Sequence, residues 1–184
     1  MRPPRPARPD EAPALAALAE ETFRATFGAA NTRADLDLHC ARAYGPAQQA
    51  AELADPALLT LVVTEGEALV AYAQLRLGAA APACVRGARP AELCRLYALP
   101  SLHGRGAGPA LLTAGLTAAA ARGAGVVWLG VWEHNPRARH FYARAGFVEV
   151  GAHTFWLGTD PQRDLILQRP APAEETPSDP KHPA

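Results

Sequence analysis

The chain has 184 residues, enough for one domain with a sizeable core but too few for two ordinary domains. Its 18 Lys and Arg residues balance its 18 Asp and Glu residues, so the formal net charge is zero. A nucleic-acid-binding protein would normally carry a basic patch and a high pI, so this balance argues against a nucleic-acid partner. Hydrophobic residues make up 49% of the chain, which is too many for a disordered protein.

The start of the chain carries no sign of export or membrane insertion. Residues 1–13 are broken by prolines and lack the apolar segment of a secretory signal. No apolar run approaches the ~18 residues that a bilayer-spanning helix needs. We therefore expect a cytoplasmic protein that has no membrane partner.

The cysteines and histidines form no recognisable disulfide or metal motif. The odd number of cysteines and the lack of a CxxC pair indicate reduced thiols. These cysteines are Cys40, Cys84 and Cys94. Four histidines lack the i,i+4 pairing that is typical of zinc sites. They are His103, His134, His140 and His153. We expect no bound metal.

The first third of the chain is predicted to be mainly helical. Prolines restrict residues 1–8 to an edge strand or an extended arm. Apolar residues at helical spacing predict a helix that begins at Asp10, its candidate cap, and a second helix that begins at Thr32. A short third helix is expected over residues 48–53.

The rest of the chain alternates between strands and helices. The expected elements are a hairpin of strands over 58–63 and 68–77, a loop over 78–90, a strand over 92–99, a helix over 106–122, a strand over 126–132, a helix over 135–145, and strands over 147–157 and 164–167. This order predicts an α/β (α+β) fold with one domain over residues 1–169. Residues 170–184 hold too little apolar surface to fold, so we expect a disordered tail there.

A glycine-rich loop joins a strand to a helix over residues 99–112. Gly104, Gly106 and Gly108 let backbone N–H groups approach an anion, and the N-terminus of the following helix adds partial positive charge. Pro109 suits the first turn of that helix, and His103 and Arg105 add donors. The loop therefore predicts a phosphate or pyrophosphate site, and the alternative is a tight turn without a ligand.

Two nucleotide-binding motifs do not fit this loop. A P-loop needs GxxxxGK[ST], and the chain has no Lys before position 181. A dinucleotide loop needs GxGxxG after the first strand, whereas these glycines are spaced differently and come late in the chain.

The segment HGRGAGPALL, residues 103–112, resembles the acetyl-CoA pyrophosphate loop of the GCN5-related N-acetyltransferases (GNAT). That loop is usually Arg/Gln-x-x-Gly-x-Gly/Ala, and here His103 stands at the Arg/Gln position with Gly106 and Gly108 as the glycines. Residues 135–147, NPRARHFYARAGF, resemble the family's N-x-x-A-x-x-F-Y-x-x-x-G-F. The resemblance implies a mixed, mainly antiparallel sheet flanked by helices, whose splayed central strand pair binds acetyl-CoA.

A narrower resemblance lies near the C-terminus. Residues 151–166, GAHTFWLGTDPQRDLI, look like the ending of bacterial polyamine (spermine/spermidine) acetyltransferases. This similarity implies a polyamine acceptor. Five carboxylates in the expected substrate half of the chain suit a polycation. They are Glu20, Glu21, Asp35, Asp37 and Glu92.

The reaction implied is direct attack of an amine on the thioester of acetyl-CoA. The resemblance makes Tyr142 the candidate general acid for the leaving thiolate, and the alternative is a packing tyrosine beside Phe141 and Phe147. Glu92 is the candidate general base, acting through a water molecule, and the alternative is a solvated carboxylate at a strand end. We assign no catalytic role to His153 or Asp164.

The same resemblance implies which residues bind the coenzyme. The backbone of Tyr97, Ala98 and Leu99 is expected to pair with the pantetheine, and alternation along this strand places Glu92, Cys94 and Leu96 on one face with Arg95 and Tyr97 on the other. Asn135 is expected at the pantetheine arm or as a helix cap, and Arg144 at a nucleotide phosphate or on a solvated helix face. The expected pyrophosphate loop comprises His103, Gly104, Arg105, Gly106, Ala107, Gly108 and Pro109.

Three functions are compatible with these residues. The first is an acetyl-CoA-dependent N-acetyltransferase that acts on a polyamine. The second has the same chemistry with a protein N-terminus or another small amine as acceptor. The third is a catalytically weak acyl-CoA-binding module, which would need the glycine loop but not Tyr142. Exposed strands near the C-terminus are compatible with a homodimer.

Overall fold

Seven strands form one sheet in the computed structural model, which describes residues 1–78 and 80–172. The strand order is β1-β2-β3-β4-β5-β7-β6. The strands are β1 (Arg5–Pro6), β2 (Leu58–Glu65), β3 (Ala68–Leu77), β4 (Pro90–Ala98), β5 (Val126–Trp132), β6 (Val148–Leu157) and β7 (Asp160–Pro170). The helices are α1 (Ala12–Phe27), α2 (Arg33–Ala43), α3 (Pro46–Ala54), α4 (Ala107–Ala120) and α5 (Pro136–Arg144). The predicted mixed, mainly antiparallel fold is confirmed.

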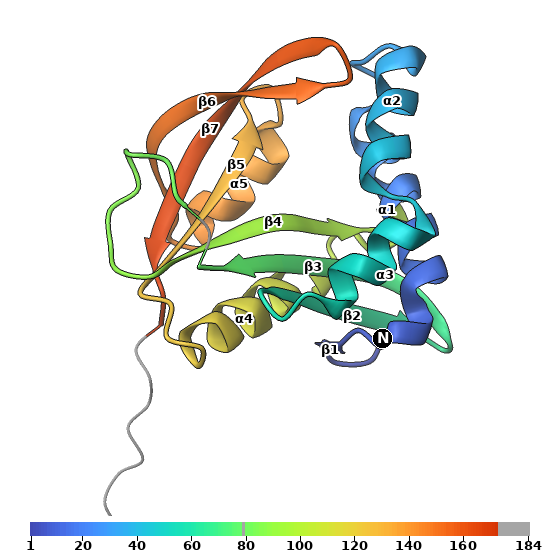
Figure 1. Ribbon diagram of the computed structural model, residues 1–184, viewed down its shortest axis with the longest axis horizontal. Coiled ribbons are helices and arrows are strands. Elements are labelled where there is room, and N and C mark those ends of the chain that lie inside the picture. Colours follow the sequence, from blue (N-terminus) through green and yellow to red (C-terminus); the bar gives the residue numbers. More distant parts are fainter. Residues whose placement is uncertain (79, 173–184) are drawn as a thin grey trace, which may run out of the picture.

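The sheet opens at its centre. The strands β4 and β5 are the parallel pair among the described strands, and their ladder covers three residue pairs, from Pro90↔Val126 to Glu92↔Trp128. Beyond Glu92 the two strands diverge, while β3 pairs with β4 and β7 pairs with β5 along almost their whole lengths. Figure 1 shows the result as two wings of sheet that separate like the arms of a V.

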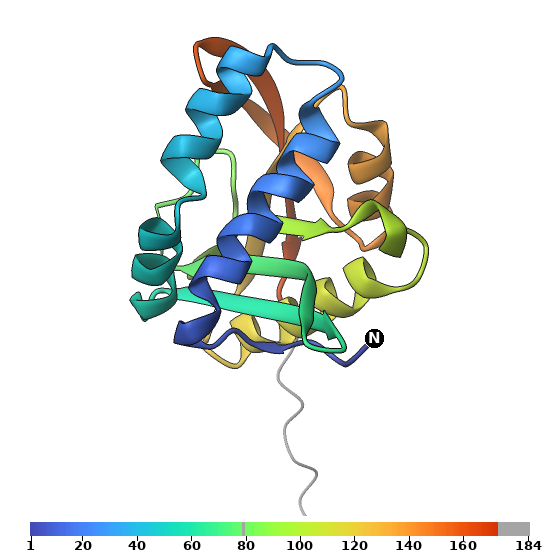
Figure 2. The same ribbon diagram turned by 90° about the vertical axis from the view of Figure 1, so that its right-hand side faces the viewer.

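Helices cover the two faces of this sheet separately (Figures 1 and 2). On one face, α4 and α5 contribute Leu111 and Tyr142 to a core that they share with inward-facing strand side chains such as Leu129. On the opposite face, α1 and α2 pack against Val62 and Tyr72. In Figure 2, α1 crosses in front of the sheet. Each face of the sheet therefore has its own packed core, and the gap between the wings connects the two faces.

The predicted alternation along β4 is confirmed for Arg95, Leu96 and Tyr97 but is wrong for Glu92 and Cys94, because the strand carries a bulge. Gln74 pairs with Arg95 while the next residue of β3, Leu75, pairs with Leu93, so Cys94 is an extra residue in the ladder. The bulge shifts the side-chain alternation by one position. Leu93 and Leu96 both pack toward α4, whereas Arg95 and Tyr97 face the side that α1 covers.

The N-terminal segment differs from the prediction at its helix cap. Residues 5–6 form the expected edge strand against β2. Asp10 does not cap α1, because a 3-10 turn over Pro9–Glu11 precedes the helix. The buried Glu11 carboxylate instead accepts hydrogen bonds from the Arg8 backbone at 2.7 Å and from Arg5 at 2.6 Å. A carboxylate at a helix start is favourable, and this one also anchors β1 to the helix.

The hairpin of β6 and β7 docks on the start of α2. Thr32 caps α2 as predicted, since its hydroxyl accepts from the Asp35 backbone. The Asp35 carboxylate accepts hydrogen bonds from the Thr159 backbone and hydroxyl, both at 2.8 Å. Gly158 lies close by with φ +61°, and a Cβ there would come within 2.6 Å of Asp35. This contact holds the hairpin beside the helices that precede the sheet.

The C-terminal boundary falls slightly beyond the prediction. The last strand, β7, extends to Pro170, so the expected domain end at residue 169 lies inside it. The disorder expected over 173–184 lies outside the described residues. In the described part of the chain, no helix is both long and apolar enough to cross a membrane.

A buried ion pair ties β4 to α3. Arg95 donates to the Glu52 carboxylate at 2.6 Å and to Gln74 at 3.0 Å, and the side chains of Arg95 and Glu52 are only 17% and 9% exposed. The guanidinium also lies over the ring of Tyr44, 5.1 Å from its centroid. The cost of desolvating these two charges is offset because Arg95 and Glu52 pair with each other and also form hydrogen bonds with further polar groups.

We predict that Glu52→Gln lowers the free energy of unfolding by about 3 kcal/mol, because it leaves the buried Arg95 charge without its counter-charge. The matched control is Glu65→Gln, which breaks the exposed 3.1 Å pair with Arg105 and is expected to cost less than about 1 kcal/mol. Urea denaturation of the two variants measures the difference. Equal losses would contradict a structural role for the Glu52–Arg95 pair.

Candidate active site

A cavity of about 660 Å³ passes through the gap between β4 and β5. Its walls come from both faces of the sheet. On the α4 and α5 side they include Gly104, Gly106, Ala107, Gly108, Pro109, Phe141 and Tyr142. On the opposite side they include the aromatic or imidazole rings of Phe23, Phe27, His39, Tyr44, Trp132 and Phe155. The cavity can therefore receive one reactant from each face of the sheet.

The glycine loop has the geometry of an anion site. Gly106 is the N-cap of α4, a helix of 14 residues, and adopts φ +88°. Gly104 adopts φ +78°. A Cβ at either glycine would meet nothing within 4 Å, so the space over the loop is open. Backbone N–H groups at the start of a helix favour a phosphate in such a space.

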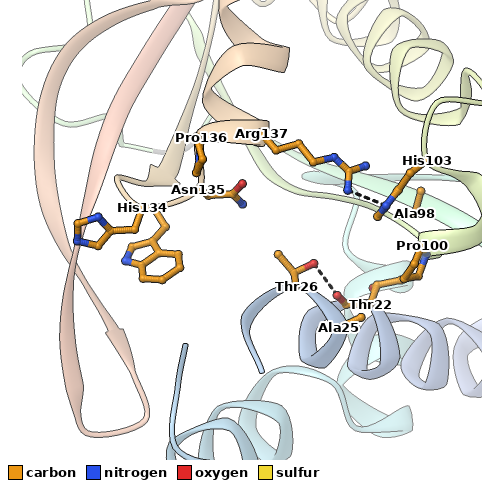
Figure 3. A pocket seen from close by; sticks show the side chains of 11 residues that line it. Thr22, Ala25, Thr26, Ala98, Pro100, His103, His134, Asn135, Pro136 and Arg137 are labelled. Carbon is orange, nitrogen blue, oxygen red and sulfur yellow. Dashed lines mark hydrogen bonds between the residues drawn. The ribbon is translucent and has the colours of Figure 1, made fainter. Parts of the chain in front are cut away.

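An arginine and a histidine side chain meet at the mouth of the gap. Figure 3 shows His103, which follows β4, facing Arg137 from the first turn of α5. The Arg137 guanidinium lies 2.6 Å from His103 Nδ1. Burial and the Arg137 charge lower the pKa of His103, so the imidazole is neutral at pH 7 and accepts from the guanidinium. An adjoining cavity of about 220 Å³ lies between these groups and α1.

The predicted coenzyme residues divide into two groups. Most of them line the cavity, and these are Tyr97, Ala98, His103, Gly104, Gly106, Ala107, Gly108, Pro109 and Asn135. Leu99, Arg105 and Arg144 do not. Leu99 donates its backbone N–H to Val70, Arg105 pairs with Glu65, and Arg144 is exposed on α5. Asn135 combines its two expected positions, since it lines the cavity and also caps α5 by accepting from the Ala138 backbone at 3.0 Å.

Tyr142 lies in the cavity wall on the α5 side. Its ring packs edge-on against the rings of Phe141 and Phe147, whose centroids lie 5.0 and 5.5 Å away. Tyr142 therefore packs against these two rings, as the alternative expected, and it also lines the cavity. Burial raises the pKa of its hydroxyl, which therefore remains protonated at neutral pH. A protonated phenol in the wall can donate to a ligand atom in the gap.

Glu92 and Asp164 occupy different positions around the gap. Glu92 is the last residue of β4 that pairs with β5, and it is not among the residues that line the cavity. Burial raises its pKa. Asp164 on β7 does line the cavity, and burial raises its pKa to about 6. The sequence assigned Asp164 no role, although its position directly before the apolar run of residues 165–167 was a usable signal.

The cavity is less acidic than the sequence suggested. Of the five carboxylates expected to hold a polycation, none lines the cavity. Glu20 and Asp37 pair with Arg24, and Asp35 holds the β6–β7 turn. The far end of the cavity is instead aromatic, with His39 stacked on Phe23 at 4.3 Å.

The cysteine in the cavity wall is not activated. Cys94, the bulged residue of β4, has a thiol whose pKa burial raises to about 12. Because the thiolate is the reactive form, this side chain is a poor nucleophile at neutral pH. Cys94 is therefore a poor candidate for an acyl-cysteine intermediate. Among residues 1–78 and 80–172, no group of three His, Cys, Asp or Glu side chains is placed to hold a metal ion.

The chain is similar to a known protein family and to several known proteins. Residues 14–147 match the model of the acetyltransferase (GNAT) family. An uncharacterised N-acetyltransferase of Mycobacterium tuberculosis is 36% identical over 160 residues, covering 86% of this chain and 97% of the relative. Another, from Lactobacillus delbrueckii, is 31% identical over 158 residues, covering 85% and 90%. The chain belongs to the GNAT acetyltransferase family.

Solved GNAT structures share the fold at low sequence identity. A PaiA N-acetyltransferase from Thermoplasma acidophilum, solved with coenzyme A, superposes with a TM-score of 0.74 at 20% identity, covering 91% of this chain and 97% of its own. A ribosomal-protein-S18-alanine N-acetyltransferase from Escherichia coli superposes with a TM-score of 0.67 at 17% identity, covering 96% and 99%. This GNAT domain is an acetyl-CoA-dependent acyltransferase that uses acetyl-CoA as co-substrate.

We predict that Gly106→Val in this GNAT domain abolishes measurable acetyl-CoA binding. A β-branched residue resists φ +88°, and its side chain would occupy the open space over the N-terminus of α4. Gly66→Val is the matched control, because Gly66 also has positive φ and open space but lies in the turn between β2 and β3. Isothermal titration calorimetry compares the two. Unchanged affinity in Gly106→Val would rule out this loop as the pyrophosphate site.

Proposed function

We propose that the enzyme transfers the acetyl group of acetyl-CoA to a primary amine that enters from the α1 and α2 side of the sheet. The observation that carries this proposal is the continuous cavity from the glycine loop to the aromatic pocket through the gap between β4 and β5. The thioester would lie in the gap, and the amine would reach it from the opposite face. Holding both reactants in line supplies much of the rate in such a transfer.

Within this proposal the predicted residues that line the cavity have defined tasks. Glycine-loop N–H groups would hold the pyrophosphate, and the unpaired edge of β4 around Tyr97 and Ala98 would pair with the pantetheine. Tyr142 would protonate the departing thiolate. Glu92 remains a predicted base, and its place outside the cavity lining requires a water molecule to carry the proton.

We predict that Tyr142→Phe lowers kcat by roughly 10²–10³ while acetyl-CoA binding survives, because the ring stays and only the donor is lost. Tyr72→Phe is the matched control, since it also removes a buried hydroxyl but from a residue outside the cavity lining. Steady-state kinetics and calorimetry on both variants test the role. Wild-type kcat in Tyr142→Phe would make Tyr142 a packing residue only.

We propose two acceptor classes, each supported by a separate feature. A polyamine is supported by residues 151–166, which resemble the ending of polyamine acetyltransferases and supply Phe155, Gln162 and Asp164 to the cavity wall. A monoamine with an adjoining apolar group is supported by the ring-lined pocket and its single carboxylate. A protein N-terminus belongs to this second class where its first side chain is apolar.

A turnover screen separates these two classes. It compares spermidine and spermine with phenethylamine and short peptides, at fixed pH and two ionic strengths. With only one carboxylate in the cavity, we expect KM for spermidine to change less than threefold between 50 and 300 mM salt, about the effect of screening one charge. Higher kcat/KM for spermidine than for phenethylamine supports the polyamine class, and the reverse order supports the monoamine class.

Assembly and location remain predictions. The edge strand β6 carries Val148 and Trp156, which are 58% and 61% exposed, and this exposure supports the proposed homodimer. We likewise propose a cytoplasmic location.

A further inference from the structure

Asp164 is the single Asp or Glu side chain in the lining of the cavity. Among the described residues, no hydrogen bond or ion pair holds its carboxylate, in contrast to the carboxylates of Glu11, Asp35 and Glu52. Partial burial of a carboxylate that has no protein partner lowers the stability of the fold, so a purely structural role does not account for Asp164. Such a group in a cavity is a candidate for chemistry.

The register of the sheet aims this carboxylate at the gap. Asp164 pairs with Trp132 of β5 on one side and with His153 of β6 on the other. Gly130 of β5 has no side chain to fill the space between them. A Cβ at Gly130 would lie 3.3 Å from Asp164 Oδ2 and 2.9 Å from His153 Nε2. Both polar groups therefore reach across β5 at the edge that borders the gap.

The surroundings of Asp164 raise the pKa of its carboxyl group. Burial has the largest effect on its pKa, and His153 partly opposes that effect. From β4, Tyr97 faces Asp164, and burial together with this carboxylate raises the pKa of Tyr97. The other ionisable or charged side chains in the cavity wall on this side are His39, Tyr44 and Arg95, and Arg95 is neutralised by Glu52. At pH 7 Asp164 is mostly ionised, and it can still accept a proton readily.

We propose that Asp164 is the catalytic residue that accepts the proton of the attacking ammonium group. This inference rests on the proposed transfer from acetyl-CoA to a primary amine. Asp164 lies on the face of the sheet that holds the aromatic pocket, whereas Tyr142 lies on the face that holds the glycine loop. The base and the acid thus stand on opposite sides of the gap.

The proposed transfer moves two protons from the nitrogen and exchanges a C–S bond for a C–N bond. One ammonium proton moves to the Asp164 carboxylate, and the freed nitrogen lone pair forms the C–N bond to the thioester carbonyl carbon. The C–S bond then breaks, and sulfur leaves with the electron pair and takes the proton of the Tyr142 hydroxyl. The second nitrogen proton then moves to the Tyr142 oxygen, which restores the phenol. Asp164 finally releases its proton to water.

The decisive experiment compares Asp164→Asn with the control Glu149→Gln, and with Glu92→Gln as the variant of the competing base, across pH 5.5–9.5. The amine is the one that the wild-type enzyme acetylates fastest in the turnover screen. For Asp164→Asn we expect kcat at pH 7 to fall by roughly 10²–10⁴. The activity should then rise about tenfold per pH unit toward the pKa of that amine, about 10 for an alkyl amine and about 8 for a peptide N-terminus, because only free amine reacts. Glu149→Gln changes an exposed carboxylate of β6 outside the cavity lining, so it should keep the wild-type profile, whose acid limb lies near pH 6.

Two further measurements separate chemistry from structure. Calorimetry should give wild-type acetyl-CoA affinity for Asp164→Asn, which a misfolded variant could not do. In Asp164→Ala, added formate should restore part of kcat, because a small carboxylate can occupy the vacated space and accept the proton.

Three outcomes overturn the proposal. One is a raised KM with unchanged kcat in Asp164→Asn, which would make Asp164 a docking group for the ammonium. The second is a steep pH profile in Glu92→Gln with a normal one in Asp164→Asn. The third is loss of acetyl-CoA binding in Asp164→Asn together with no rescue by formate in Asp164→Ala. A wild-type enzyme that acetylates no amine in the screen would instead refute the proposed function itself.

Discussion

The early separation of β4 from β5 is the constraint on which the rest of this structure depends. Strands in a sheet normally satisfy each other's backbone N–H and C=O groups along their whole length. Here the shared ladder stops at Glu92, while each strand keeps a complete ladder with its outer neighbour. Two stable wings therefore hold two unpaired edges apart. An extended ligand such as a pantetheine chain can satisfy those edges, and no rearrangement of the chain is needed to admit it.

The separation also divides the chemistry between two faces. The positive φ of Gly106 and the start of α4 prepare one face for an anion, and Tyr142 lies on that same side. The other face carries the aromatic rings from α1, α2, β5 and β6 together with Asp164. In the proposed reaction, reactants that arrive from opposite faces would meet in the gap, and no covalent enzyme intermediate would be required. The protonated thiol of Cys94 fits this direct route.

The charge in the cavity wall is set by local ion pairs and not by the net charge of the chain. Arg95 brings a positive charge into the wall, and Glu52 neutralises it from α3 at 2.6 Å. Most acids that looked available for a polycation are surface residues or are held by Arg24 and the Thr159 turn. Asp164 is left as the carboxylate of the lining, with the aromatic rings as its neighbours. This balance explains why a neutral chain can still offer an ammonium group a defined place.

The sequence by itself determined the order of strands and helices, the glycine loop and the Asn135-to-Phe147 block. These features depend on local properties: apolar spacing, capping groups and a backbone conformation that only glycine adopts easily. The tertiary structure alone decided the rest. The bulge at Cys94 put Glu92 on the same face as Arg95 and Tyr97, and the contact of Asp35 with Thr159, 124 residues away, set the position of the β6–β7 hairpin. Whether Glu92 or Asp164 lines the cavity depends on strand register and on where two strands part. Both are fixed by pairing between distant segments, which no local pattern in the chain encodes.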